Sequence, residues 1–214
     1  MKEGTKKPVV ITKALLTRLP LYYCYLRDRI GEEEYISSAS LATSLNLNPV
    51  QVRKDLAAVS RSAGTPRLGF SAHTLLEDLQ EFLGYDNENE VFLVGVGGLG
   101  RTLLAYEGFT QYGLRIVAGF DVDENLVGLK INGKTIFPMS KLHDLVKRLN
   151  VKIGIIAVPK EYAQEVCNTL IKAGILAIWN FAPTHLDVPE HIVVKNENLA
   201  ASLANLTKQI TDKI

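Results

Sequence analysis

Apolar residues recur every three or four positions in the first third of the chain, which is typical of helices with one buried face. The clearest series consists of Leu15, Leu19, Tyr22, Leu26 and Ile30. Pro20 lies within this series, and a proline should kink a helix or begin one. The pattern predicts a helical first part whose apolar stripe faces inward.

A short helix and a longer helix should follow. Ser37 or Ser38 can cap the first, which would run through Ser44. Asn48 can cap the second, with Pro49 at its first position, where a missing N–H costs nothing. Two helices joined by so short a turn are typical of a helix-turn-helix, whose second helix enters the major groove of DNA.

The second of these helices separates its apolar from its polar residues. At the helical period, Val52, Leu56 and Val59 share one face and should pack inward. The outward positions are Gln51, Lys54 and Arg61, with Arg53 on the flank. An ordinary solvated helix face would look similar, so the DNA interpretation depends on the helix-turn-helix spacing.

The segment from Gly64 to Phe70 contains the turn residues of a hairpin tip. Such a wing would place Arg67 beside the second helix, where a cation can enter a narrow minor groove. A plain surface loop would have the same composition, and this segment taken alone favours the loop.

Short apolar runs alternate with helical patterns after residue 85, which predicts a parallel sheet covered by helices. The candidate strands are Val91–Gly95, Arg115–Phe120, Ile153–Val158, Ala177–Phe181 and His191–Val194. Candidate helices include Leu99–Tyr106 and Ala163–Ala173. The predicted class is therefore α/β with two domains: an N-terminal winged helix-turn-helix and a C-terminal Rossmann domain.

Three glycines follow the first candidate strand directly. Gly95, Gly97 and Gly100 form the motif GxGxxG. In a dinucleotide-binding turn the first glycine permits the tight turn, the second lets the backbone approach a pyrophosphate, and the third lets helix and strand pack closely. The motif also occurs by chance, so its position between a strand and a helix is what makes it informative.

An acidic residue ends the next candidate strand. Asp121 stands 21 residues after Gly100, where a carboxylate accepts hydrogen bonds from a ribose 2′-hydroxyl and repels a 2′-phosphate. This favours NAD(H) over its phosphorylated relative. A Rossmann-like domain that holds no dinucleotide, or holds another nucleotide such as coenzyme A, is the alternative.

Charge is segregated along the chain although its net value is only +1. Basic residues outnumber acidic ones up to residue 70, so this part of the chain should face phosphate.

Cys24 and Cys167 are isolated and indicate neither a disulfide framework nor a zinc site. No signal peptide is recognisable, and no segment approaches the roughly 20 apolar residues of a membrane span. We expect a cytoplasmic protein with no metal and no membrane partner.

A dehydrogenase would need a proton donor or acceptor beside the nicotinamide. Lys160 and His185 are the only candidates near strand ends, and Tyr-x-x-x-Lys is absent. We therefore expect no catalytic residues. A small NAD-dependent oxidoreductase, or a nucleotide-binding regulatory module without DNA binding, is the alternative function.

Several stretches, in unbroken order from about Ala14 to Leu206, resemble the Rex family of redox-sensing transcriptional repressors. They are LPLYYCYL, SSASLA, NPVQVRKDL, VGVGGLG, GFDVD, AVPKEYAQEV and AGILAIWNFAP. The resemblance implies a homodimer that binds operator double-stranded DNA and is released from it by NADH. It also implies a C-terminal helix, residues 197 to 213, swapped between subunits. The expected domains are 1–85, 86–196 and 197–214.

Motif, position and resemblance together assign three groups of site residues. The residues expected around NAD(H) are Gly95, Val96, Gly97, Gly98, Leu99, Gly100, Asp121, Val158 and Pro159. Those expected to contact DNA are Ser38, Gln51, Arg53, Lys54, Arg61 and Arg67. The resemblance also implies three switch residues, Arg27, Tyr106 and Asn198, and the family has an Asp at the last. The wing sequence and Gly98, where the family usually has Asn, also depart from the family pattern.

Overall fold

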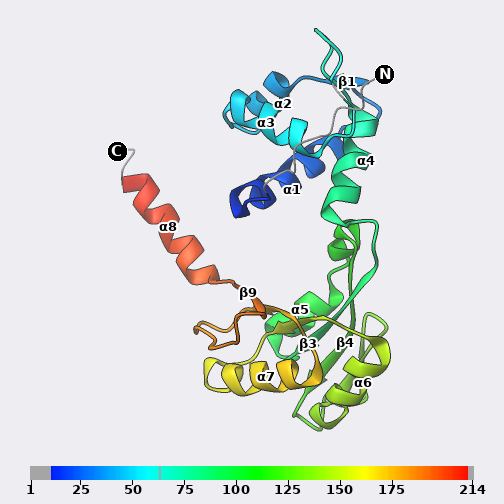
Figure 1. Ribbon diagram of the computed structural model, residues 1–214. Helices are drawn as coiled ribbons and strands as arrows, with labels where there is room; N and C mark the ends of the chain where they lie inside the picture. Colours follow the sequence, from blue (N-terminus) through cyan, green and yellow to red (C-terminus); the bar gives the residue numbers. More distant parts are fainter. Residues whose placement is uncertain (1–10, 63, 212–214) are drawn as a thin grey trace. The chain divides into compact units, whose positions relative to one another are not determined.

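The computed structural model describes residues 11–62 and 64–211, and the chain divides into two compact units between Asp86 and Asn87 (Figure 1). The first unit is helical with a two-stranded antiparallel sheet. Its elements are α1 (Lys13–Arg27), β1 (Tyr35–Ile36), α2 (Ser38–Ser44), α3 (Pro49–Val59), β2 (Phe70–Ser71) and α4 (Ala72–Leu83).

The two predicted caps are confirmed. The Ser37 hydroxyl accepts a hydrogen bond from the backbone N–H of Ser40 and begins α2. Asn48 Oδ1 accepts from the N–H groups of Val50 and Gln51 and begins α3, with Pro49 in the first turn. Side-chain oxygens thus satisfy N–H groups that have no partner within the helix.

Two details of α1 bear on the expectations. Pro20 lies inside the helix and does not begin a segment, so of its two expected effects only a kink is left. Ile30 is exposed, because α1 ends at Arg27 and the helical period ends with it. The buried stripe therefore stops at Leu26.

Each helix of the first unit contributes to one apolar core. Its fully buried members are Leu19, Tyr22, Leu41, Val52, Leu56, Leu75 and Leu79. Helix α4 packs against α1 and α3, and α2 packs against α3. The sequence analysis did not predict α4, although Leu75 and Leu79 have the four-residue spacing of one helix face.

The second unit is a seven-stranded sheet with helices on both faces. Its strands are β3 (Asn89–Val94), β4 (Leu114–Asp121), β5 (Lys130–Ile131), β6 (Lys134–Pro138), β7 (Ile153–Ile156), β8 (Ala177–Asn180) and β9 (Val193–Asn196). Its helices are α5 (Gly98–Ala105), α6 (Leu142–Leu149), α7 (Lys160–Ala173) and α8 (Leu199–Thr211), with 3₁₀ turns at Gly108–Tyr112 and Met139–Lys141.

The strands follow the order β5-β6-β4-β3-β7-β8-β9, and every neighbouring pair is parallel except β5 with β6. From β6 to β9 this is the order of a doubly wound dinucleotide-binding sheet. The chain changes direction across the sheet between β3 and β7. Ligands of such sheets bind beyond the carboxyl ends of the strands at this place.

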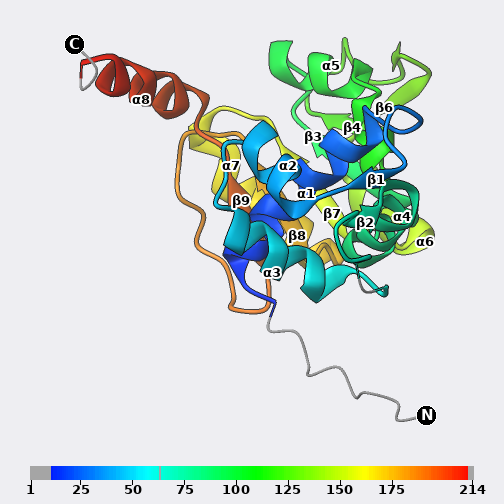
Figure 2. The same cartoon turned by 90° about the horizontal axis from the view of Figure 1, so that it is seen from above.

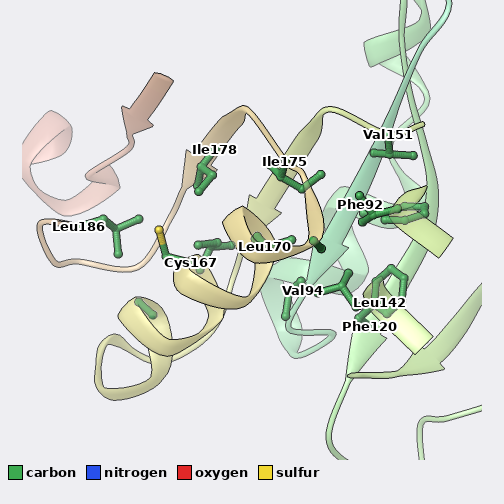
Figure 3. Packing of buried hydrophobic residues seen from close by; sticks show 14 of the residues in the cluster. Phe92, Val94, Phe120, Leu142, Val151, Cys167, Leu170, Ile175, Ile178 and Leu186 are labelled. Carbon is green, nitrogen blue, oxygen red and sulfur yellow. The ribbon is translucent and has the colours of Figure 1, made fainter. Parts of the chain in front are cut away.

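Alternate residues of the strands face opposite sides of the sheet. On one side Phe92, Val94 and Phe120 pack under α6 and α7, together with Cys167 and Leu170 (Figure 3). Burial raises the pKa of the Cys167 thiol. On the other side Val91, Leu93 and Ile155 pack under α5. The glycine turn between β3 and α5 is therefore anchored by two cores.

All five predicted strands are confirmed, with ends shifted by no more than two residues. The predicted helices correspond to α5 and α7, and α7 begins three residues earlier than expected. The hairpin β5–β6 and helix α6 were not predicted.

Helix α8 leads away from the sheet in both views (Figure 1, Figure 2). Its apolar residues Leu199, Leu203, Leu206 and Ile210 are all exposed. They recur at the spacing of one helix face, so α8 presents an apolar stripe that its own unit does not cover. Within the described part of the chain, no helix is long and apolar enough to cross a membrane.

Candidate functional site

The glycine turn lies where β3 ends and α5 begins, at the carboxyl edge of the sheet. Two of its glycines are required by the fold. Gly95 has φ +97°, and a Cβ there would lie 2.6 Å from the carbonyl oxygen of Ala157. A Cβ at Gly100 would collide with the carbonyl oxygen of Gly95. Any side chain at these positions would push helix, turn and strand apart.

The other two glycines are not required by contacts within the chain. A Cβ at Gly97 or Gly98 would meet no atom within 4 Å. Gly97 is the N-cap of α5 and provides no side-chain cap. The helix N-terminus therefore opens onto free space with its N–H groups directed outward, which is the arrangement that binds phosphate.

Asp121 ends β4 next to this turn. Its Oδ2 accepts a hydrogen bond from the N–H of Val96 at 2.6 Å, and its Oδ1 accepts from the N–H groups of Val122 and Asp123 at 2.7 and 3.0 Å. A carboxylate offers about four acceptor sites, so about one remains for an outside hydroxyl. The sequence did not predict that Asp121 would also hold the glycine turn in place.

Val158 follows β7 and closes the other side of the turn. Its Cγ1 lies 2.7 Å from the Cβ position of Gly95. Pro159 is exposed and begins α7. Val96 is buried, whereas Leu99 is partly exposed on the first turn of α5. The structure thus brings the predicted cofactor residues to one edge of the sheet, around the point where the chain changes direction.

The far end of α5 is fixed by the β5–β6 hairpin. Lys134 Nζ donates to the carbonyl oxygen of Leu104, and Asn132 Nδ2 donates to that of Ala105 and to the Glu107 carboxylate. Burial lowers the pKa of Lys134, and Glu107 partly opposes this. Tyr106 follows directly as the C-cap, exposed, with its ring 5.0 Å from that of Phe109. A cation near the C-terminus of a helix is electrostatically favourable, so Lys134 helps to hold this end of α5 in place.

Asn180 at the end of β8 is a polar residue that the sequence did not single out. Its side chain is fully buried and makes four hydrogen bonds. Nδ2 donates to the oxygens of Ala182, Thr184 and Asn196, and Oδ1 accepts from the N–H of Ala182. The NFAP segment was the available signal, and the structure shows that its asparagine shapes the loop beyond the sheet.

Two of the residues expected to act as a switch make local contacts within their own units. The Arg27 guanidinium pairs with Asp28 at 2.9 Å. Asn198 Oδ1 accepts from the N–H of Ala201 at 2.8 Å, at the start of α8. An aspartate would accept the same bond, so an asparagine at this position retains the capping role.

The two faces of α3 match the predicted separation of apolar from polar residues. Val52, Leu56 and Val59 are buried, whereas Gln51, Arg53 and Lys54 are exposed. Ser38, the first residue of α2, is half-buried. The first turns of α2 and α3 thus expose polar groups, as a helix-turn-helix requires.

A buried carboxylate on the inner face of α3 was not predicted. Asp55 accepts from Arg18 Nε at 2.6 Å and Nη2 at 3.0 Å, from the Tyr22 hydroxyl at 2.8 Å and from Gln51 Nε2 at 2.7 Å. Burial alone would raise the pKa of Asp55, but these hydrogen bonds together lower it. Burial and the neighbouring carboxylate raise the pKa of Tyr22. The cluster joins α1 to α3.

Arg61 does not lie on the outward face of α3, where the helical period predicts it. It lies beyond the end of α3, and its guanidinium pairs with Asp78 at 2.6 Å and with Glu81 at 2.5 Å on α4. Burial would raise the pKa of Asp78, yet hydrogen bonds from the backbone and side chain of Arg61 and from Ser60 lower it. Because two carboxylates already balance its charge, Arg61 serves to hold the end of α3 against α4.

The hairpin interpretation of the wing is confirmed at its tip. Thr65 and Gly69 form an antiparallel bridge, and Phe70 pairs with Ile36 in the small sheet. Arg67 lies at the tip with φ +69°, a conformation that few non-glycine residues adopt. The tight loop therefore displays a cation at its end.

The candidate catalytic residues do not form an acid–base pair. Lys160 and His185 are both exposed, and neither side chain forms an ion pair within the described ranges. No group of three or more His, Cys, Asp or Glu that could hold a metal ion is present among the residues that the structure describes.

Two known families match separate parts of the chain. Residues 10–57 match a family described as the N-terminus of putative DNA-binding proteins, and residues 86–184 match the CoA binding domain family. The first match covers α1 through most of α3, and the second covers most of the sheet with the glycine turn.

Solved structures similar to nearly the whole chain include those of RSP, which is described as a Rex-family repressor. A structure of RSP in complex with NAD⁺ and operator DNA has a TM-score of 0.88 at 30% identity and covers 95% of this chain and 94% of that one. A complex of RSP with NADH has a TM-score of 0.85 at 30% identity and covers 95% of this chain and 96% of that one.

Curated relatives are similar over nearly their full length. The redox-sensing transcriptional repressor Rex of Carboxydothermus hydrogenoformans is 41% identical over 94% of this chain and 96% of its own. That of Treponema denticola is 38% identical over 92% of this chain and 93% of its own. With its helix-turn-helix, its glycine turn and these similarities, the chain belongs to the Rex family of redox-sensing transcriptional repressors.

Proposed function

We propose that the protein represses transcription by binding operator DNA as a homodimer, and that NADH binding releases it. It would thereby report the NADH/NAD balance of the cytoplasm. The observation that carries this proposal is the open face at Gly97 and Gly98, at the carboxyl edge of a doubly wound sheet. The same chain presents a helix-turn-helix with exposed polar residues on α3.

NAD(H) fits the geometry around the glycine turn. Its pyrophosphate would approach Gly97, Gly98 and the start of α5, with Val158 and Pro159 alongside. The remaining acceptor site of Asp121 would take a ribose hydroxyl, and its charge would disfavour a 2′-phosphate. The complexes of RSP with NAD⁺ and with NADH support this choice over coenzyme A.

Operator contacts would come from the helix-turn-helix and the wing. The proposed residues are Ser38, Gln51, Arg53, Lys54 and Arg67. We leave Arg61 out, because Asp78 and Glu81 balance its charge. Cations and small polar groups would position the helix on phosphates, while α3 reads base edges.

Dimerisation would bury the uncovered apolar stripe of α8. An exchanged helix would place Leu199, Leu203, Leu206 and Ile210 against a second copy of the chain. We assign residues 1–85 to the DNA-binding domain, 86–196 to the dinucleotide domain and 197–214 to the dimerisation segment. Arg27, Tyr106 and Asn198 would exchange contacts as the cofactor changes.

The coupling between the two sites need not be large. A tenfold loss of DNA affinity corresponds to about 1.4 kcal/mol. A rotation that changes the spacing of the two recognition helices would supply it, because half-sites repeat with the turn of the duplex. Linkage then requires DNA to weaken NADH binding by the same factor.

The test uses a labelled duplex that the protein itself selects from a random-sequence pool. Saturating NADH should weaken binding of this duplex at least tenfold, and NAD⁺ should weaken it much less. The duplex should weaken NADH binding by the same factor as NADH weakens duplex binding. DNA binding that is indifferent to saturating NADH would contradict the proposal.

We propose no catalytic role for any residue. The curated relatives are named as repressors, and Lys160 and His185 are exposed and form no acid–base pair. Replacing either residue should therefore leave NADH binding and release from DNA unchanged.

A further inference from the structure

The exposed Gln51 on α3 has one end of its amide occupied. Its Nε2 donates to Oδ1 of Asp55 at 2.7 Å, one helical turn further along. An ionised carboxylate accepts hydrogen bonds and cannot donate them, so the nitrogen end of the amide must face Asp55. The oxygen Oε1 is then left for a partner outside the chain.

The carboxylate that imposes this orientation is itself fixed. Asp55 is buried, and Arg18 holds it through two hydrogen bonds while Tyr22 supplies a third. Charge-assisted bonds of this kind are short and strong. Asp55 therefore cannot turn away to let the Gln51 amide rotate without breaking the contact between α1 and α3.

We propose that Gln51 is a specificity-determining residue that reads an exocyclic amino group in the major groove, adenine N6 or cytosine N4, through its Oε1. This deepens the proposed function and rests on it. Gln51 lies in the first turn of α3, the part of a recognition helix that contacts base edges. Guanine offers only acceptors on its major-groove edge, so it cannot donate to Oε1, whereas the second hydrogen of Nε2 can still reach an acceptor.

The experiment removes single groups from the selected duplex. In one series each adenine of a half-site is replaced by purine and each cytosine by 2-pyrimidinone, which removes one amino group at a time. In a second series 7-deazapurines remove one N7 acceptor at a time. Both series are measured with wild-type protein and with Gln51→Met, which keeps a similar length but cannot accept the bond.

One amino removal should weaken wild-type binding about tenfold and leave Gln51→Met binding unchanged. Comparing the two proteins on the same duplex cancels the effect of weaker base pairing. Arg53→Met serves as the matched control, because it should still respond to that amino removal. Circular dichroism and NADH affinity confirm that each variant is folded.

Two outcomes would overturn the inference. They are coupling of Gln51 to N7 removal alone, and no coupling to any group, which includes an equal loss of affinity for every duplex. Release by NADH is scored separately on the unmodified duplex, so a failure of sensing is distinguished from a failure of base reading. If no duplex is selected, the proposed function and the inference both fail.

Discussion

The two units of the molecule bury different kinds of side chain. Among the described residues, the first unit buries two carboxylates, Asp55 and Asp78, each held by an arginine, whereas the only polar side chain buried in the second is the neutral Asn180. Hydrogen bonds to carboxylates are directional, whereas apolar packing is not. Hydrogen bonds in the first unit can therefore fix the orientation of side chains on α3, such as Gln51. The core of the second unit holds the strands together, and the space beside Gly97 and Gly98 stays free of side chains.

The largest expected effect tests the buried carboxylates. Asp55→Asn should lower the free energy of unfolding of the first unit by about 3 kcal/mol, because removing one partner of a buried ion pair leaves the others uncompensated. Glu81→Gln, which alters an exposed partner of Arg61, should cost less than about 1 kcal/mol. Urea unfolding followed by circular dichroism measures both. Equal costs would contradict the special role given to the buried carboxylates of the first unit.

The next largest effect tests the open glycines. Gly97→Val should weaken NADH binding about 100-fold, or about 2.7 kcal/mol, because the side chain fills the space for the pyrophosphate. Its melting temperature should change little, since a Cβ at Gly97 meets no neighbour. Gly100→Ala is the contrasting variant and should destabilise the second unit. NADH titration and thermal unfolding separate the two, and normal NADH binding by Gly97→Val would place the cofactor elsewhere.

As the pH falls, the first unit should unfold before the second. Asp55 and Asp78 have lowered pKa values when folded, so the stability they contribute is present above their unfolded pKa of about 3.9 and is lost as the pH falls through their folded values. The single tryptophan, Trp179, reports on the second unit alone. Circular dichroism should therefore change at a higher pH than Trp179 fluorescence, and the reverse order would contradict the comparison.

The smallest expected effect tests whether DNA binding by the first unit is separate from NADH binding by the second. Lys54→Ala should weaken duplex binding about five- to tenfold and reduce the slope of log affinity against log salt by about 1, because one phosphate contact is lost. NADH affinity should stay unchanged. Lys172→Ala, an exposed lysine in the last turn of α7, is the control and should alter neither affinity. Affinity measurements at several salt concentrations provide the test.

The sequence predicted the second unit better than the first. Short apolar runs identified five of the seven strands, and GxGxxG located the turn, because these features depend on neighbours in sequence. The contacts of Asp55 with Arg18 and of Asp78 with Arg61 join residues 37 and 17 positions apart. No local pattern marks such pairs, so the sequence assigned Arg61 to DNA.

The same reasoning explains the partial success at the candidate site. Spacing alone pointed to Asp121, but its bond to the N–H of Val96 depends on the register of β3 and β4. Likewise the helical period placed Gln51 outward without showing that Asp55 holds its amide nitrogen. Contacts within the chain, inside one helix for Gln51 and between neighbouring strands for Asp121, determine what a correctly located residue has available for a ligand.

Helix α5 connects the open glycines to Tyr106. Eight residues of helix span about 12 Å and behave as a stiff rod. Its far end is tied by Lys134 and Asn132 to the hairpin at the edge of the sheet. These contacts hold the last turn of α5, so a ligand that displaces the first turn would not simply unwind the other end of the helix. Under the proposed function, a shift of the whole helix would carry the hairpin and the Tyr106 ring with it.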